Sequence, residues 1–247
     1  MFLLHPFLIA LQFLTILPVR LKEPPDSKAM GRSLPYYPLI GLLLGALLAF
    51  LGWGLGDAPT LIATALILAV WVLLTGGMHL DGLADSADAW IGGMGNRQKT
   101  LAIMKDPCCG PAAVATLLLL LLIKFAALEH LVATKNWEIL MLPPVLGRTT
   151  LVLLFLTTPY VRPNGLGSQI ANHFSRRASA AVTLFVLVAV FLFIGIAAFW
   201  LLLPVAGAFL VLRTLMQRRI GGATGDTAGA LVEITETAVL LTAALMG

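Results

Sequence analysis

Long apolar stretches alternate with polar breaks along the whole chain. The stretches cover residues 2–17, 38–56, 59–78, 111–133, 138–158, 180–203, 205–216 and 227–246. A helix of about 20 apolar residues crosses a bilayer, so the pattern predicts an all-α transmembrane bundle of about six to eight membrane helices. Pro204 separates the sixth stretch from the short seventh, and we expect these two to form a hairpin or one kinked element. Residues 1–247 are expected to form one membrane domain.

Composition agrees with a membrane location. Apolar residues make up 59% of the 247 residues and charged residues only 11%, against about 25% charged residues in soluble domains. This excludes a soluble globular protein, a disordered chain and a nucleic-acid-binding protein. The first stretch has no preceding basic residues and no small-residue cleavage site at its end. We therefore interpret it as a retained helix that either spans the membrane or lies in its interface.

The positive charges indicate a topology. Most of the 16 Lys and Arg residues lie in or beside four polar breaks, at 18–37, 79–110, 159–179 and 217–226. If the helices from 38–56 onward cross in alternation, all four breaks lie on one side of the membrane. The positive-inside rule makes that side cytoplasmic, and the active site is expected there.

Three aspartates form the strongest candidate cluster. Asp81, Asp85 and Asp88 have the spacing i, i+4, i+7, which places them on one face of a helix. Three carboxylates on one face repel each other unless a cation lies between them, and such oxygen ligands suit Mg²⁺. His79 is a candidate to orient a phosphate or carry a proton. The alternative interpretation is a solvated helix end in a cytoplasmic loop.

A second candidate cluster is the glycine-rich segment 221–229, which precedes the last apolar stretch. Its glycines allow close approach of a ligand to the backbone, and a helix that starts there favours anions. Arg218 and Arg219 stand just before the segment, and Asp226 lies within it. We interpret this as half of a phosphate or metal site that faces the three aspartates. The alternative is a turn in which Asp226 or Thr227 caps the helix.

Two cations lie in the middle of apolar stretches. Lys124 and Arg148 occupy positions where a charge is costly, so each marks either a function or a partner. They are candidates to reach the carboxylate cluster or an anionic substrate. The alternative is a structural ion pair with Glu129, Glu233 or Glu236. Together these features favour Mg²⁺-dependent phosphoryl transfer, and a cation transporter is the competing class.

Several motifs resemble one family. The segment GGMHLDGLADSAD at 76–88 resembles the signature of the cobalamin synthase family, also called adenosylcobinamide-GDP ribazoletransferase or cobalamin-5′-phosphate synthase. Four more matches occur in order over nearly the whole chain, at FLTILPV (13–19), YPLIG (37–41), GLG (165–167) and GATGDTAG (222–229). This chain departs from the family pattern at one position, because it has Cys108 about where family members are expected to have a basic residue.

The resemblance implies a late step of cobalamin biosynthesis in the bacterial inner membrane. Adenosylcobinamide-GDP and α-ribazole, or its 5′-phosphate, would give adenosylcobalamin, or its 5′-phosphate, and GMP. Mg²⁺ would be held by Asp81, Asp85, Asp88 and Asp226, and one carboxylate, such as Asp88, would take the hydroxyl proton. The residues expected to bind phosphate or substrate are Lys105, Lys124, Arg148, Arg218, Arg219, Gly222 and Gly225.

The resemblance also bears on partners and on rival functions. The expected partners are the two substrates and membrane lipid, with no nucleic acid; a homo-oligomer and contacts with other cobalamin-assembly enzymes are left open. The rival functions are an ion-coupled transporter and another membrane phosphotransferase of the CDP-alcohol type. The second rival lacks support because the pattern Asp-x-x-Asp-Gly-x-x-Ala-Arg does not occur in the chain.

Overall fold

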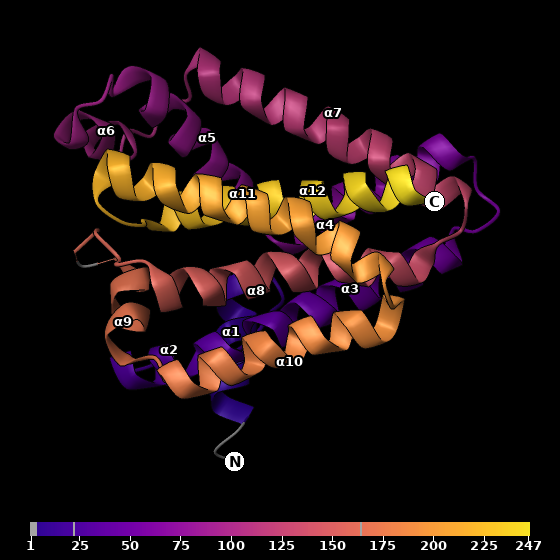
Figure 1. Cartoon of the computed structure of the whole chain (residues 1–247), viewed down its shortest axis with the longest axis horizontal. Helices are drawn as coiled ribbons and strands as arrows, with labels where there is room; N and C mark the ends of the chain where they lie inside the picture. Colours follow the sequence, from indigo (N-terminus) through magenta and orange to yellow (C-terminus); the bar gives the residue numbers. More distant parts are fainter. Residues whose placement is uncertain (1–3, 22, 164) are drawn as a thin grey trace.

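The computed structural model describes residues 4–21, 23–163 and 165–247, and these form a bundle of helices (Figure 1). The first part of the chain contains α1 (Leu4–Leu14), α2 (Ser27–Ser33), the 3₁₀ turn η1 (Leu34–Tyr36), α3 (Tyr37–Gly54), α4 (Thr60–Leu74), α5 (Met78–Gly92), α6 (Arg97–Ile103) and α7 (Pro111–Ala133). The second part contains η2 (Trp137–Met141), α8 (Leu142–Thr157), α9 (Leu166–His173), α10 (Arg176–Ile194), α11 (Ala197–Ile220) and α12 (Gly225–Met246).

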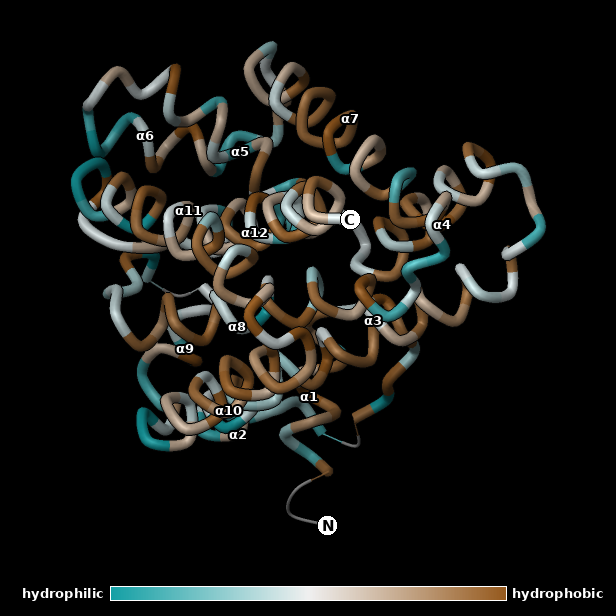
Figure 2. Tube along the Cα trace, turned by 45° about the vertical axis from the view of Figure 1, so that its right-hand side comes forward, coloured by the Kyte–Doolittle hydropathy of each residue, from teal (hydrophilic) through white to brown (hydrophobic). Residues whose placement is uncertain are grey.

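The predicted class is confirmed: the described chain is all-α and has the helices of a multi-pass membrane protein. Among the described residues, six helical segments are long and apolar enough to cross a bilayer, and a seventh is added if α4 and α5 count as one broken span. Figure 2 shows hydrophobic residues along α3, α8 and α10, and hydrophilic residues mainly at helix ends and loops. Many large apolar side chains on these helices are exposed, for example Phe50 and Phe185, which is the surface that lipid covers.

The expected crossing at 59–78 is wrong in its boundaries. Gly76 and Gly77 have φ of 62° and 67°, a left-handed conformation that glycine adopts readily. The chain therefore bends by 84° between α4 and α5. Helix α4 alone is 15 residues long, or about 22 Å, which is shorter than the roughly 30 Å hydrocarbon core. Helix α5, which carries the three aspartates, thus leaves the direction of α4 and belongs, from His79 onward, to the polar break 79–110.

The predicted separation at Pro204 is wrong, because two helices do form over this region but the turn between them lies at Gly195 and Ile196. Gly195, with φ of 60°, ends α10, and α11 begins at Ala197 with Pro204 inside it. The proline removes one backbone donor, which does not stop a helix when its neighbours satisfy the freed carbonyl. Helix α10 also starts earlier than the apolar pattern predicted, because the Ser175 side chain accepts a hydrogen bond from the Ala178 N–H and caps it.

The first apolar stretch forms the short helix α1. Its 11 residues are too few for a crossing, which favours the interfacial alternative. Ile9 and Leu14 are buried against the core that also contains Leu34 and Ile40. Residues 2 and 3 of the predicted stretch lie outside the described residues.

The four polar breaks meet at one end of the bundle, which we call the polar end. Helix α2 packs on α9, and α6 packs on both α5 and α11. Arg162 of the third break pairs with Asp226 of the fourth. Lys135 and Asp57 lie at the opposite end, where the α3–α4 and α7–η2 connections meet. The polar end is on the left in Figure 1, and the C-terminus is on the right.

Helix α12 forms the centre of the bundle and contacts α5, α7, α8 and α11. Its buried side chains are mostly small, including several Ala, Gly and Thr residues, and small residues let helices approach closely in a membrane. Its N-terminus is fixed by a capping box between Thr224 and Thr227. The position of α12 therefore determines where Asp226 lies.

Candidate active site

A cavity of about 270 Å³ opens at the polar end between α1, α3, α5, α8, α9 and α12. Every motif behind the family resemblance contributes to its lining. The contributing residues are Phe13 and Leu14, Tyr37, His79, Asp81 and Gly82, Gly165, Leu166 and Gly167, and Gly225, Asp226, Ala228 and Gly229. Segments far apart in the sequence thus meet around one small space.

Glycines let α5 and α12 approach closely enough to form this cavity. A Cβ added at Gly82 would lie 2.7 Å from the Asp226 carbonyl oxygen, and one at Gly229 would lie 3.2 Å from the backbone of His79. Any larger side chain at Gly82 would separate the helices. The contact brings Asp81 and Asp226 to the same cavity, so the prediction that the two acidic segments face each other agrees with the geometry.

Asp226 has a cationic partner in the described structure. The Arg162 Nη2 lies 2.7 Å from the Asp226 Oδ2, and it also donates a hydrogen bond of 3.2 Å to the Met104 carbonyl. Thr227, not Asp226, takes part in the helix cap. Arg162 is not among the site residues predicted from the sequence. Its position three residues before the GLG match at 165–167 was the one signal that could have identified it.

Asp85 lies close enough to Asp81 and Asp226 for their charges to raise its pKa. Burial, followed by the charges of Asp81 and Asp226, raises the pKa of the Asp85 carboxyl to about 6. The side chains as they lie bring no three His, Cys, Asp or Glu residues together as a metal site within the described ranges. Of the acidic groups that affect Asp85, Asp226 forms an ion pair with Arg162.

Asp88 has a structural role that its spacing did not reveal. Its Oδ2 accepts a hydrogen bond of 2.6 Å from the Gly110 N–H, and its Oδ1 accepts one of 2.9 Å from the Ala113 N–H. These donors belong to the first turn of α7, which has no side-chain cap of its own. Asp88 thus caps α7 from α5 and does not line the cavity; its role as base or metal ligand stays a prediction.

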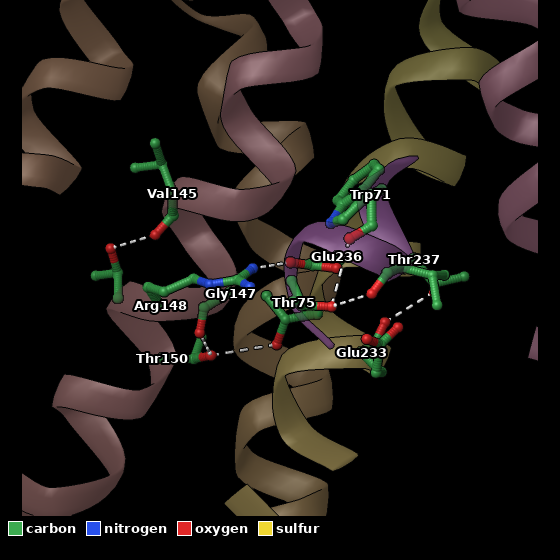
Figure 3. A network of polar contacts seen from close by, with 12 residues as sticks. Trp71, Thr75, Val145, Gly147, Arg148, Thr150, Glu233, Glu236 and Thr237 are labelled. Atoms are coloured by element: carbon green, nitrogen blue, oxygen red, sulfur yellow. Dashed lines mark hydrogen bonds and ion pairs between the residues drawn. The ribbon is translucent and has the colours of Figure 1, made fainter. Parts of the chain in front are cut away.

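Lys124 and Arg148 form a buried ion network, as the pairing alternative described. The Lys124 Nζ lies 2.9 Å from Glu233 and 2.7 Å from Glu236, and Arg148 pairs with the other oxygen of Glu236. Figure 3 shows Arg148 pointing at Glu236, with Glu233 and Trp71 nearby. Neither cation lines the cavity, so the structure does not support their predicted contact with substrate.

The remaining candidates divide between the cavity and the surroundings. His79 is buried and lines the cavity, as does Gly225. Gly222 instead packs against the Pro159 carbonyl, where a side chain would collide. Lys105 and Arg218 are exposed outside the cavity. Arg219 donates a hydrogen bond to the Trp90 carbonyl and so joins α11 to α5.

The fold and the cavity together define a class, namely a multi-pass helical membrane enzyme with an acidic site at one end of its bundle. The family can also be stated: the chain matches the model of the Cobalamin-5-phosphate synthase family over residues 6–244 and belongs to that family.

Close relatives cover the chain almost completely. A protein of Pseudomonas fluorescens Pf-5 named adenosylcobinamide-GDP ribazoletransferase is 54% identical over 240 residues, which is 97% of this chain and 99% of the relative. Proteins with the same name from Pseudomonas syringae pv. syringae B728a and Pseudomonas putida GB-1 are 53% and 54% identical, over 98% and 97% of this chain and 99% and 98% of theirs. No solved structure matches the chain.

Proposed function

We propose that this protein joins adenosylcobinamide-GDP to α-ribazole or its 5′-phosphate and releases GMP. The observation that carries the proposal is that all five family motifs meet at one cavity, which also holds Asp81, Asp226 and Arg162. The names of relatives that match nearly the full chain support the same reaction. A transporter would not need this convergence of motifs on a small cavity at one end.

The residues of the cavity suit phosphoryl transfer. A hydroxyl of the acceptor ribose attacks the phosphorus that carries cobinamide, the bond from this phosphorus to the bridging oxygen breaks, and GMP leaves with that oxygen. The hydroxyl proton passes to a carboxylate, and we assign this role to Asp81 because it lines the cavity. We assign the contact with the diphosphate to Arg162, which also lines the cavity and whose guanidinium would stabilise charge that develops on the phosphate oxygens.

The donor set at the polar end fits Mg²⁺. Asp81, Asp85 and Asp226 supply the hard oxygen ligands that this ion prefers. Burial first, and then the neighbouring charges of Asp81 and Asp226, raise the pKa of Asp85, and a bound cation would compensate that negative charge. Asp88 is left out because both of its oxygens accept backbone hydrogen bonds. When bound, the ion would neutralise charge on the diphosphate.

The decisive experiment measures GMP. Protein purified in detergent receives adenosylcobinamide-GDP and α-ribazole-5′-phosphate with Mg²⁺, and a parallel sample receives EDTA. We expect GMP and a cobalamin product only with the divalent ion. Release of CMP from CDP-diacylglycerol, or ion flux in proteoliposomes without GMP, would instead support one of the rival functions.

The polar end is proposed to face the cytoplasm. Its cations outnumber those of the opposite end, where Lys135 lies, as the positive-inside rule requires of cytoplasmic loops. This orientation also places the cavity on the side where nucleotide substrates are found.

A further inference from the structure

The cavity has two sides of different chemistry. Asp81, Asp226 and Arg162 form an acidic side from α5, α12 and the segment after α8. Apolar and aromatic lining residues come from α1, α3, α8, α9 and the segment between α8 and α9, and we call them the aromatic side: Phe13, Leu14, Tyr37, Leu151, Phe155, Tyr160, Leu166 and Ile170. Phosphoryl transfer uses only the acidic side, so the aromatic side needs another explanation.

Aromatic rings form two walls of this side. Phe13 of α1 and Tyr37 of α3 are stacked with their centroids 6.1 Å apart. Phe155 of α8 and Tyr160 are stacked at the same distance and are nearly parallel, with 14° between their planes. Gly167 packs directly on the Tyr160 ring, where a Cβ would collide. The walls are thus built from four segments and held in shape by their neighbours.

Few buried polar atoms of the described cavity lining lack a hydrogen-bond partner. Among the described lining residues, the buried side-chain atoms without a hydrogen-bond partner are Tyr37 Oη, His79 Nε2 and Arg162 Nε. Arg162 belongs to the acidic side. A group that binds at the aromatic side therefore meets flat apolar surfaces and at most two unsatisfied polar atoms.

We infer that the aromatic side binds the base of the acceptor nucleoside, an inference that rests on the proposed function. Ribazole carries a dimethylated benzimidazole, which is flat, apolar and has one unsubstituted ring nitrogen able to accept a hydrogen bond. Tyr37 and His79 each offer a group that can donate to it. The ribose then extends toward Asp81 and Asp226, where its hydroxyl reacts.

The other two candidate occupants fit less well. Guanine has a carbonyl, an amino group and ring N–H and nitrogen atoms at its edges, and burying these without partners is costly. A corrin ring with its side chains is far larger than a nucleoside. The cavity of about 270 Å³ is slightly smaller than the usual small-molecule pocket of about 300–1,000 Å³. The corrinoid and the guanosine are thus expected to lie outside the aromatic side.

The test separates the KM values of the two substrates. Phe155→Ala removes half of one aromatic wall, and Phe50→Ala is the matched control because Phe50 is exposed on α3. We expect Phe155→Ala to raise the KM for α-ribazole about tenfold, as loss of an aromatic contact does, with the KM for adenosylcobinamide-GDP changed less than about twofold. A rise only for adenosylcobinamide-GDP, or no change for either substrate, would overturn the inference.

Two further measurements keep the inference testable. If Phe155→Ala does not fold, Tyr37→Phe keeps the ring, removes only the hydroxyl, and is expected to raise the same KM severalfold. Equilibrium dialysis of α-ribazole against the wild type and Phe155→Ala in detergent needs no turnover. If α-ribazole binds the wild type and Phe155→Ala weakens this binding, the aromatic side is supported as the site of the base even if no GMP forms. If GMP forms but Phe155→Ala binds α-ribazole as tightly as the wild type, the proposed transferase activity is supported and the inferred site of the base is refuted.

Discussion

Four aspartates at the polar end differ in their contacts, so we expect their substitution to have different effects. Asp81 and Asp226 line the cavity, and their charges raise the pKa of Asp85. Asp88 instead holds the first turn of α7. Spacing on one helix face groups Asp81, Asp85 and Asp88 together, but only the packed structure shows that Asp88 caps α7 while Asp81 lines the cavity.

Asp226→Asn keeps the size of the side chain and removes its charge. Because Asp226 pairs with Arg162 and lines the cavity, we expect GMP release to fall by at least about a hundredfold, as when charged groups that stabilise a transition state are removed. Asp57→Asn is the control, since Asp57 is fully exposed at the opposite end. Activity of Asp226→Asn near the wild-type level would remove Asp226 from the site.

Asp88→Ala removes both acceptors from the α7 N-terminus. We expect a loss of about 1 kcal/mol in the free energy of unfolding, the usual effect of losing a helix cap, seen as a lower Tm in detergent. Asp88→Asn retains one acceptor oxygen and is expected to keep most activity. If Asp88→Asn abolished GMP release without changing the Tm, Asp88 would belong to the chemistry after all.

At the level of elements, glycine contacts and the ion network fix α12 in the bundle. Gly82 and Gly229 set its distance from α5, while Glu233 and Glu236 tie it to α7 and α8 through Lys124 and Arg148. The first pair controls the site directly and the network supports it from within the span. Two substitutions test these roles separately.

Gly82→Ala puts a methyl group 2.7 Å from the Asp226 carbonyl, so α5 and α12 must move apart. We expect the kcat to fall at least about tenfold, because small displacements in an active site have large effects on rate, while the protein still inserts. Gly207→Ala is the matched control, since nothing lies within 4 Å of a Cβ there. Equal activity of the two variants would show that the close approach is not needed.

Lys124→Met leaves Glu233 and Glu236 with only Arg148 as a cationic partner. Breaking a buried pair in this way costs about 3–5 kcal/mol, so we expect a strongly lowered Tm. The double variant Lys124→Met with Glu233→Gln restores the balance of charge and should recover most of the loss. A double variant less stable than Lys124→Met alone would contradict this account of the network.

At the level of the whole molecule, the architecture gathers four polar breaks at one end. Cys108 and Cys109 are exposed in one of these breaks, which offers a test of the proposed orientation. A membrane-impermeant maleimide should label them in inverted vesicles and leave them unlabelled in right-side-out vesicles, and detergent should expose both. Labelling from the outside of intact cells would reverse the orientation.

Much of the architecture followed from the sequence, because apolar length and cation position report directly on the bilayer. The sequence did not locate the bend at Gly76 and Gly77, since left-handed glycines leave no mark in hydropathy. It brought Asp81 and Asp226 together as facing segments, but it missed Arg162, whose pairing depends on how the segment after α8 folds back. The sequence left Glu129, Glu233 and Glu236 as possible partners of Lys124, and the packing of α7 on α12 shows that they are Glu233 and Glu236.

The buried ion network also has a consequence for the order in which the chain is made. Glu233 follows Lys124 by 109 residues, so at about 5–20 residues per second the ribosome delivers it roughly 5–20 seconds later. During that interval Lys124 and Arg148 are in or near the bilayer without the carboxylates that neutralise them. The bundle can therefore close only when its last helix arrives, and a chain that stops short of α12 displays two unmatched cations to the machinery that removes incomplete membrane proteins.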